Sequence, residues 1–536
     1  MFCFIPNKGD ELMILLEASN LKISVQDRIL LAINKLAIHQ NERIGLVGKN
    51  GSGKTTLLKA LAGEITTDTG TVTAKAVVEL LPQLKITATT KSGGEVTQQY
   101  IIEAINKNPE ILLADEPTTN LDASHIEWLE KILKNWHGAF VVVSHDRAFL
   151  DTLCTTIWSI EGGKLHVYKG NYTDYAQQKQ LERKQQELSY EKYIKEKTHL
   201  EKALAQKKQK AQRATKKPKK KSSSEAKITG AKPYFAKKQK KLHQAAKAIE
   251  TRLNKLQQVK KPQVGAPLKM DLLAEDTITG KIVIRINELS ASFGELLLWE
   301  GVSFDVRGGD KLAIIGPNGS GKTTLVKKIV NRAQGVVISP SVRIGYFDQN
   351  MDILDVNLSI LENVSANSLQ SEAFIRTVLA RLHFFRDDVY KQVKVLSGGE
   401  RIKVSLAKLF VSDINILILD EPTNFLDTEA MEALESLLCE YTGTIIFVSH
   451  DRRLIENVAT RVLAINNKQV EIFDGTYHEY KKSKAKPLDP QEHKRLVIET
   501  KISAVLSRLS IEPSPALEAE FQELMAAKKA LEGSEK

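Results

Sequence analysis

The chain has 536 residues, of which 42% are hydrophobic and 26% are charged, with a formal net charge of +12 at pH 7. This is the balance of an ordinary globular protein with room for about three or four domains. No apolar run approaches the roughly 18 residues of a membrane-spanning helix, and the three cysteines lie far apart without a CxxC pair, as expected in a reducing compartment.

Residues 1–12 precede the first predicted strand and are interpreted as an upstream extension. They have no basic start, and Asp10 and Glu11 interrupt any apolar run, so they do not resemble a secretory signal peptide. A strand-like segment follows Met13, and we therefore expect the folded chain to begin at residue 13.

A glycine-rich loop runs from Gly48 to Thr55, between a strand-like apolar run and a helical one. This context is that of a P-loop, whose backbone N–H groups surround phosphates at the positive end of a helix. The pattern recurs from Gly316 to Thr323, and two copies exclude a chance match. We expect nucleotide phosphates to contact Gly48, Asn50, Gly51, Gly53, Lys54, Thr55 and Thr56 in the first loop, and Gly316, Asn318, Gly319, Gly321, Lys322, Thr323 and Thr324 in the second.

Further segments recur in both halves in the same order, so the chain contains two copies of one ATP-binding unit. They are SGGE at Ser92, Gly93, Gly94 and Glu95 and again at Ser397, Gly398, Gly399 and Glu400; apolar strands ending in Asp115-Glu116 and Asp420-Glu421; Leu-Asp at 121–122 and 426–427; and Ser-His-Asp-Arg around His145 and His450.

The repeated polar residues suit phosphoryl transfer, which needs positioned charge more than covalent chemistry. The lysine of each loop is expected to pair with the β- and γ-phosphates. Mg²⁺ is expected to bind Thr55, Gln83 and Asp115 in one half, and Thr323, Gln349 and Asp420 in the other. Glu116 and Glu421 are predicted to polarise the attacking water, and His145 and His450 to orient it.

These segments resemble, in order, the Walker A, Q-loop, signature, Walker B, D-loop and switch-histidine motifs of the ATP-binding-cassette ATPases. The resemblance covers residues 13–165 and 283–470. It implies that ATP and Mg²⁺ are the cofactors, and that the signature of one cassette completes the site of the other within one monomer. Lys54 would then share ATP with Ser397–Glu400, and Lys322 with Ser92–Glu95.

The two halves differ in length between the Q-loop and the signature. The second half has about 39 more residues between Gln349 and Ser397 than the first has between Gln83 and Ser92, and residues 358–385 are predicted to be helical. In membrane exporters this helical subdomain couples to the membrane part. Its loss from the first half weighs against a transport role.

The halves also differ in the residue expected to stack on adenine. Phe293 occupies the position where the family places an aromatic residue, whereas the first half has Ser24 and Val25 there. Because both glutamates and both histidines are present, we expect both sites to hydrolyse ATP.

A basic linker at residues 176–260 separates the two cassettes. Residues 181–260 carry 25 Lys or Arg against 7 Asp or Glu, a net charge of +18. Residues 175–213 contain no Gly or Pro and predict a long helix, and apolar residues in heptad steps from 235 to 256 predict a second. An antiparallel helical hairpin is therefore expected. Its charge is typical of nucleic-acid binding, and a solvated linker is the alternative.

The tip of this hairpin is placed at about residues 214–235, where Pro218, Gly230 and Pro233 are expected to break the helices. Basic and aromatic side chains there are predicted to contact RNA or a drug site: Lys216, Lys217, Lys219, Lys220, Lys221, Tyr234 and Phe235. Packing within the hairpin is the alternative for the two aromatic residues.

The predicted fold class is α/β, with two tandem P-loop cassettes joined by a long helical hairpin. The cassettes are placed at residues 13–175, lacking most of the helical subdomain, and 283–481, with a connector at 261–282. Residues 482–536 contain two amphipathic segments around Pro513 and Pro515 and predict a small C-terminal helical hairpin.

Tandem cassettes, a basic helical linker and no predicted span resemble the ABC-F family of translation proteins. KSGGEVT at 91–97, GAKPYFAKKQKKL at 230–242 and HFFRDDVYK at 383–391 closely resemble its Vga-type antibiotic-resistance members. This implies a cytoplasmic ATPase that binds the drug-stalled bacterial 70S ribosome in its ATP-closed state. The tip would reach toward the peptidyl-transferase centre, beside 23S rRNA and P-site tRNA, and promote release of lincosamide, pleuromutilin or streptogramin A antibiotics.

Three alternatives remain at this stage. A housekeeping translation factor of the same family would differ mainly at the tip. The soluble motor of a drug exporter would need a membrane partner, which this chain gives no reason to expect. A DNA-repair ATPase would be favoured by zinc-type cysteine pairs, which the sequence lacks.

Overall fold

The computed structural model describes residues 13–25, 28–83, 93–119, 121–213, 231–256, 259, 279–294, 296–348, 353–424, 426–484, 521–522 and 525. The chain divides into two compact units. The first contains Met1–Lys269, Asp352–Ser412 and Phe425–Leu434, and the second contains Met270–Met351, Asp413–Asn424 and Glu435–Lys536. The first unit thus combines the first predicted cassette and the linker with two segments of the second cassette.

A six-stranded, mostly parallel sheet forms the centre of the first unit. Its order is β5-β6-β7-β3-β8-β9, with β9 antiparallel to β8. The strands are β3 (Arg43–Gly48), β5 (Val78–Leu81), β6 (Ile111–Asp115), β7 (Ala139–Val143), β8 (Thr156–Glu161) and β9 (Lys164–Lys169). Every residue of β6 and β7 is buried, as expected for central parallel strands covered on both faces.

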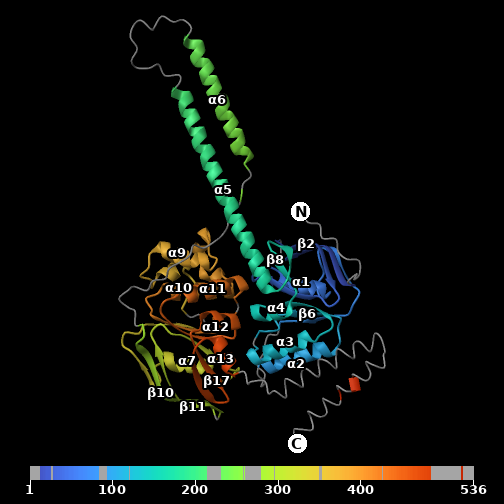
Figure 1. The fold of residues 1–536 in the computed structure, drawn as a ribbon, viewed down its shortest axis with the longest axis vertical. Helices are drawn as coiled ribbons and strands as arrows, with labels where there is room; N and C mark the ends of the chain where they lie inside the picture. The colour runs from blue at the N-terminus through green and yellow to red at the C-terminus, as the bar shows by residue number, and fades with distance from the viewer. Residues whose placement is uncertain are drawn as a thin grey trace. The chain divides into compact units, whose positions relative to one another are not determined.

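Successive residues of these strands bury into two different cores. Ile111 and Leu113 pack with α1 (Lys54–Leu61) and with the antiparallel sheet of β1 (Ile14–Val25), β2 (Arg28–His39) and β4 (Thr69–Ala74). Leu112 and Ala114 pack on the other face with α2 (Gly93–Asn106), α3 (Ala123–Lys134) and α4 (Arg147–Leu153). Figure 1 shows these helices around β6. The period-two alternation of a strand therefore builds a three-layer cassette.

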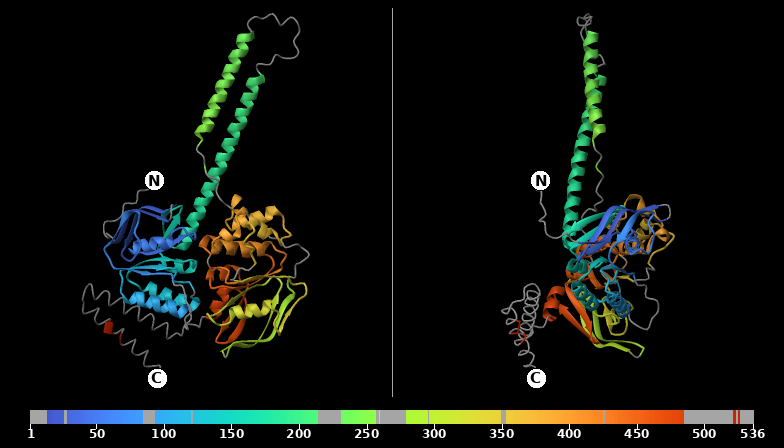
Figure 2. Two further views of the ribbon diagram at one scale, coloured as in Figure 1. Left: turned by 180° about the vertical axis from the view of Figure 1, so that it is seen from behind. Right: turned by 90° about the vertical axis from the view of Figure 1, so that its right-hand side faces the viewer.

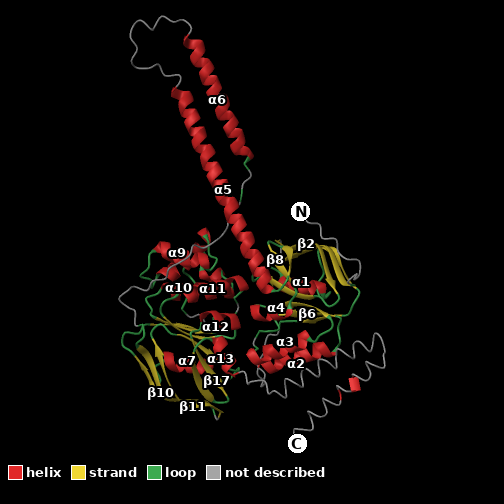
Figure 3. Cartoon of the chain, in the orientation of Figure 1, coloured by secondary structure: helices red, strands yellow, loops and turns green. Residues whose placement is uncertain are grey.

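The linker forms two long helices, α5 (Tyr172–Arg213) and α6 (Ala231–Lys255), which lie side by side in both views of Figure 2. Both described segments are helical throughout (Figure 3). At about 1.5 Å per residue, the 42 residues of α5 extend roughly 63 Å. Leu200 and Ala211 of α5 and Ala246 of α6 are buried, and ion pairs join Lys208 to Glu250 at 3.2 Å and Arg252 to Glu196 at 3.0 Å.

One predicted helix break in the linker is wrong. Pro233 was expected to interrupt the second helix, but α6 begins at Ala231 and contains it. Proline is accepted in a first helical turn, because the N–H groups of that turn have no intrahelical partner. Residues 214–230, including Pro218 and Gly230, lie outside the described residues.

The second unit repeats the cassette sheet. Its order is β14-β15-β16-β12-β17-β18, followed by an antiparallel sheet of order β11-β10-β13. The strands are β10 (Ile282–Phe293), β11 (Leu296–Arg307), β12 (Lys311–Ile315), β13 (Val336–Ile338), β14 (Ile344–Phe347), β15 (Ile416–Asp420), β16 (Thr444–Val448), β17 (Arg461–Asn466) and β18 (Gln469–Asp474). Its helices are α7 (Lys322–Val330), α12 (Arg452–Val458) and α13 (Tyr477–Lys484).

The helices predicted between the Q-loop and the signature of the second half are present in the first unit. They are α8 (Ile360–Ser365) and α9 (Glu372–Arg381), followed by α10 (Gly398–Val411). Helix α11 (Thr428–Glu440) begins in the same unit. The matching segment of the first half, residues 84–92, is outside the described residues, as is most of the predicted C-terminal hairpin.

The structure therefore has the predicted fold class, two tandem α/β cassettes with a long helix between them. The exact domain boundaries stay predictions. Among the residues that the structure describes, no helix is long and apolar enough to cross a membrane.

Candidate ATP sites

The first P-loop begins where β3 ends. Gly51 and Gly53 have φ values of +75° and +100°, in the region that favours glycine. Lys54 opens α1, and its Nζ donates to the carbonyl oxygens of Gly48 at 2.7 Å and Lys49 at 3.3 Å. Burial lowers the pKa of Lys54, and the nearby carboxylates of Glu116, Asp427 and Asp115 oppose this shift.

The second P-loop has the same geometry. Gly319 and Gly321 have φ values of +77° and +93°, and Lys322 Nζ donates to the carbonyl oxygens of Gly316 and Pro317, each at 2.9 Å. A Cβ at Gly51 or at Gly319 would meet nothing within 4 Å, so backbone conformation rather than crowding requires glycine at both positions.

Each Walker B strand ends in a buried aspartate followed by a glutamate in an unusual backbone conformation. Glu116 and Glu421 have φ values of 53° and 49°, which side-chain-bearing residues rarely adopt. Burial raises the pKa of each to about 7, against the opposing charge of the P-loop lysine. Burial also raises the pKa of Asp115 and of Asp420.

The two histidines contact these glutamates. His145 Nε2 lies 3.1 Å from Glu116 Oε1, and His450 Nε2 lies 3.2 Å from Glu421 Oε1. Burial lowers the pKa of His145 to about 4. A neutral imidazole therefore adjoins a carboxyl group that titrates near neutrality, and the pair has the chemistry to hold and orient a water molecule.

The donor set beside each P-loop fits a magnesium ion. Thr323 Oγ1 donates to Asp420 Oδ1 at 3.2 Å, and Thr55 makes the equivalent hydrogen bond to Asp115. Asp115 Oδ2 is buried and accepts no hydrogen bond from the part of the chain that the structure describes. Mg²⁺ prefers oxygen ligands and uses one or two carboxylates together with substrate phosphates. The ion would neutralise charge on the β- and γ-phosphates.

The second signature caps a helix. Ser397 Oγ accepts from the backbone N–H of Glu400 at 3.3 Å, while Glu400 Oε2 accepts from Ser397 N at 2.8 Å. This capping box leaves Ser397 and Gly398 exposed at the positive end of α10. Gly93, Gly94 and Glu95 lie in the first turn of α2, whereas Ser92 is outside the described residues.

Other predicted site residues have less structural description. Gln83 follows β5 and is exposed, and Gln349 is not described. Phe293 is the last residue of β10, and Tyr234 and Phe235 lie near the start of α6, but their side chains are not described. The tip lysines at 216–221 lie outside the described residues. The expected pairing of P-loops with signatures stays a prediction.

The structure brings together two groups of residues whose mutual contacts the sequence analysis did not predict. Thr118 Oγ1 lies 2.8 Å from Ser144 Oγ, joining the Walker B segment to the histidine loop. The backbone N–H of Asn50 donates to Asp427 Oδ2 at 3.3 Å, so the first Walker A loop contacts the D-loop that precedes α11. The sequence did carry a signal for the first group, because this Thr and this Ser recur in the EPT and VSH segments of both halves.

Comparison with known proteins agrees with this geometry. The model of a family described as ABC transporter matches residues 31–89 and 299–424. The chain is 31% identical over 526 residues to the ribosome protection protein VmlR of Bacillus subtilis, covering 92% of this chain and 93% of that protein. It is 36% identical over 459 residues to the erythromycin resistance ATP-binding protein MsrA of Staphylococcus epidermidis, covering 80% and 93%.

Solved structures show the same fold at low sequence identity. A structure described as RNase-L Inhibitor matches with a TM-score of 0.57 and 18% identity, covering 86% of this chain and 91% of that chain. Together with the two P-loops and their carboxylates, this defines a tandem ATP-binding-cassette ATPase, a class whose domains use ATP with Mg²⁺. The extent of similarity to the two resistance proteins shows that the chain belongs to the ABC-F family of ATPases.

Proposed function

We propose that this chain is a ribosomal protection protein, which binds the drug-stalled bacterial ribosome in its ATP-closed state and leaves after hydrolysis. The observation that carries the proposal is the similarity to VmlR, whose name states ribosome protection and which aligns over 92% of this chain, beyond the cassettes alone. The name of MsrA, which states erythromycin resistance, supports an antibiotic-related role.

The charge of the arm supports RNA as the contact. We define the arm as helices α5 and α6 with the residues between them. Residues 181–260 carry a net charge of +18, whereas the whole chain carries +12, so the remainder is net negative. A local excess of this size attracts phosphate backbones and releases counterions on binding. The partners would be 23S rRNA and P-site tRNA of the 70S ribosome, at which the protein would act in the cytoplasm.

The state of the ATP sites would determine when the protein binds the ribosome and when it leaves. Lys54 and Lys322 would hold the phosphates, Thr55 with Asp115 and Thr323 with Asp420 would hold Mg²⁺, and each glutamate–histidine pair would activate water. The signatures would close each site from the opposite cassette. Hydrolysis would then release the closed state, and with it the ribosome.

The finer part of the proposal concerns the drug. The sequence segments that resemble Vga-type proteins favour lincosamides, pleuromutilins and streptogramin A, which would be displaced when the tip at 214–235 reaches toward the peptidyl-transferase centre. A housekeeping ABC-F factor is the main rival, and replacement of the tip separates the two. The replacement should abolish resistance under our proposal, but leave a general growth function measurable in a housekeeping factor.

Co-sedimentation with purified ribosomes tests the proposal. The Glu116→Gln/Glu421→Gln double variant lacks the water-activating carboxylates, so its ATP-closed state should persist. We expect it to pellet with ribosomes in the presence of ATP and to release bound drug in the same tube.

The ATP dependence of co-sedimentation distinguishes the proposal from its alternatives. Pelleting without ATP would show adventitious electrostatic binding, and a supernatant-only result at physiological salt would assign the arm another partner. Drug efflux from cells that depends on this chain, without ribosome binding, would instead favour an exporter motor.

A further inference from the structure

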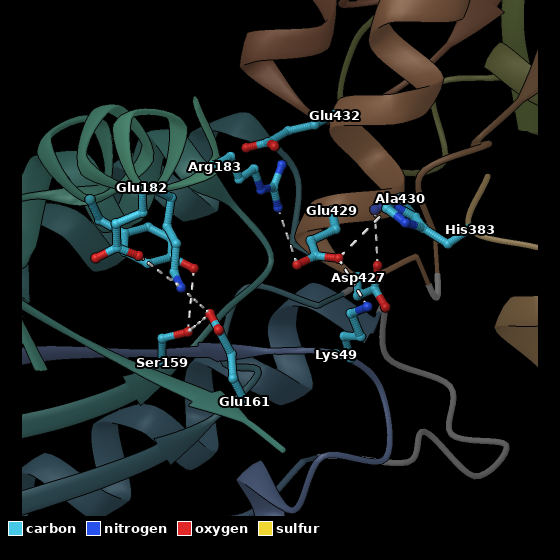
Figure 4. A network of polar contacts seen from close by, with 12 residues as sticks. Lys49, Ser159, Glu161, Glu182, Arg183, His383, Asp427, Glu429, Ala430 and Glu432 are labelled. Carbon is cyan, nitrogen blue, oxygen red and sulfur yellow. Dashed lines mark hydrogen bonds and ion pairs between the residues drawn. The ribbon is translucent and has the colours of Figure 1, made fainter. Parts of the chain in front are cut away.

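One carboxylate in the first unit lies within 4 Å of basic side chains from three separate parts of the chain. Glu429 lies in the first turn of α11, and its Oε2 is 3.3 Å from Lys49 Nζ of the Walker A loop. Its Oε1 is 3.5 Å from Arg183 Nη2 on α5, and His383 Nε2 lies 3.9 Å from Oε2. Figure 4 shows Glu429 between Lys49 and Arg183. A single side chain therefore adjoins the nucleotide loop and the arm at once.

A hydrogen bond from a backbone N–H group also fixes the start of α11 on the nucleotide loop. Asp427, two residues before Glu429, accepts from the backbone N–H of Asn50 at 3.3 Å and from that of Ala430 at 2.9 Å. Its side chain is 8% exposed. The D-loop contact thus sets the position of α11, and the Glu429–Lys49 ion pair adds to it.

A second contact fixes the arm against the same helix. The hydroxyl of Tyr172, the first residue of α5, donates to Glu432 Oε1 at 2.9 Å. Glu432 lies one turn beyond Glu429, and Arg183 lies about three turns beyond Tyr172. Two separated points of α5 therefore hold two successive turns of α11, which orients the base of the arm.

The equivalent residues of the other site cannot form this ion pair. By the internal repeat, Pro317 takes the place of Lys49, and Ser124 takes the place of Glu429. A proline and a serine carry no charge. The sequence thus confines this link to the first P-loop and makes the two ATP sites unequal.

We propose that Glu429 is a positioning residue that couples the first ATP site to the arm. Its carboxylate holds Lys49 of the phosphate-binding loop and Arg183 at the base of α5, so ATP binding at the first site and the seating of α5 stabilise each other. Coupling of this kind is reciprocal, so breaking the Arg183–Glu429 contact must alter nucleotide affinity. The proposal rests on the ATPase sites and needs no ribosome.

Titration of the full-length chain with the fluorescent analogue mant-ATP tests it. Arg183→Met acts from outside the nucleotide loop, and we expect it to raise the Kd for mant-ATP at the first site about two- to fivefold, the range of a partly exposed ion pair. Glu429→Gln should raise it at least as much, and Arg183→Lys, which keeps the charge, should restore most of the affinity.

Two matched controls separate coupling from general effects. Lys184→Met removes the same charge from the next, exposed position of α5. Glu432→Gln removes a carboxylate from α11 but keeps an oxygen that can accept from the Tyr172 hydroxyl, so the seating of α5 is retained. We expect both to leave the Kd unchanged. If either raises the Kd as much as Arg183→Met, loss of a charge near the site explains the effect, and the proposal is wrong.

Two backgrounds assign the effect to a site. With Lys322→Ala, mant-ATP reports on the first site, where Arg183→Met should raise the Kd. With Lys54→Ala it reports on the second site, where no change is expected. An equal effect in both backgrounds, or none in either, overturns the proposal. Because no ribosome enters this titration, its result stands apart from that of the co-sedimentation experiment.

Discussion

A pair of buried hydroxyl groups fixes the relation between the residues expected to activate water. Thr118 follows Glu116 by two residues, and Ser144 directly precedes His145. Their hydroxyls lie 2.8 Å apart, and Ser144 Oγ also accepts from the backbone N–H of Asp146 at 3.0 Å. In the second cassette Thr423 and Ser449 form the same pair at 3.4 Å. The pair therefore ties the histidine loop to the Walker B segment.

Replacement of Ser144 by Ala should lower kcat with little change in KM for ATP. The buried Thr118 hydroxyl would lose its partner, at a cost of about 1–3 kcal/mol, and small displacements of a reacting group reduce rates strongly. Steady-state ATPase assays measure this. Thr152→Ala on α4, an exposed hydroxyl of the same cassette, is the control. A rise in KM at constant kcat would instead assign Ser144 to ATP binding.

Two cysteines should differ in reactivity because their surroundings differ. Cys154 is 4% exposed, and burial raises the pKa of its thiol to about 12. A folded-state pKa this far above neutrality keeps the thiol protonated and unreactive at pH 8. Cys439 is exposed. We expect iodoacetamide to label Cys439 in the native protein and Cys154 only after unfolding, as read by peptide mass spectrometry. Native labelling of Cys154 would show that the end of α4 opens locally.

At the scale of elements, the arm shows which apolar patterns in the sequence predicted buried positions correctly. The heptad positions Leu242, Ala246, Ile249, Leu253 and Leu256 are buried or half-buried, whereas the residues between them are mostly exposed. The predicted seam is therefore confirmed from Leu242 onward, while the side chain of Phe235 is not described. Leu181 and Leu188 of α5 have the same apolar spacing, yet they are 57% and 58% exposed. The Arg252–Glu196 ion pair places the C-terminal end of α6 beside Glu196 of α5. The N-terminal part of α5, which contains Leu181 and Leu188, extends past this end of α6.

This difference predicts the stability of the arm. Leu200→Ala removes a side chain that is 6% exposed in the seam and should destabilise the hairpin by about 2 kcal/mol, the low end for a buried leucine because two helices can partly close the gap. Leu188→Ala should change stability by less than about 0.5 kcal/mol. Amide hydrogen exchange in α5 and α6 measures both. Equal amide protection in Leu200→Ala and Leu188→Ala would contradict the difference in burial between Leu200 and Leu188.

The nucleotide sites could be predicted from sequence because their parts are local. A P-loop lies within one strand–loop–helix segment, and each Walker B pair lies at the end of one apolar strand. The charged network around Glu429 could not, because Lys49, Arg183 and Glu429 come together only through tertiary contacts. Pro233 was misread because the signal was composition alone, and position within the first turn decided the structure.

For the whole molecule, the uneven charge distribution would set how the chain meets the polyanionic partner that we propose. The arm concentrates basic residues while the rest of the chain is net negative, which orients encounter with a polyanion toward the arm. A uniform charge of the same total would attract nucleic acid without fixing which part binds. The arrangement favours an approach in which the arm makes first contact and the cassettes respond to ATP.

Removal of the tip charges should therefore reduce the salt dependence of ribosome binding. The variant changes five lysines to Gln: Lys216, Lys217, Lys219, Lys220 and Lys221. Each phosphate contact contributes about −0.7 to −0.9 to the slope of log K against log salt, so loss of five contacts should flatten the slope by about 3 to 5. Co-sedimentation of the Glu116→Gln/Glu421→Gln background at several salt concentrations measures it. ATPase activity of the otherwise unaltered five-lysine variant, without ribosomes, should be unchanged. An unaltered slope would show that the tip lysines make no phosphate contacts and that the remaining arm carries the electrostatic attraction.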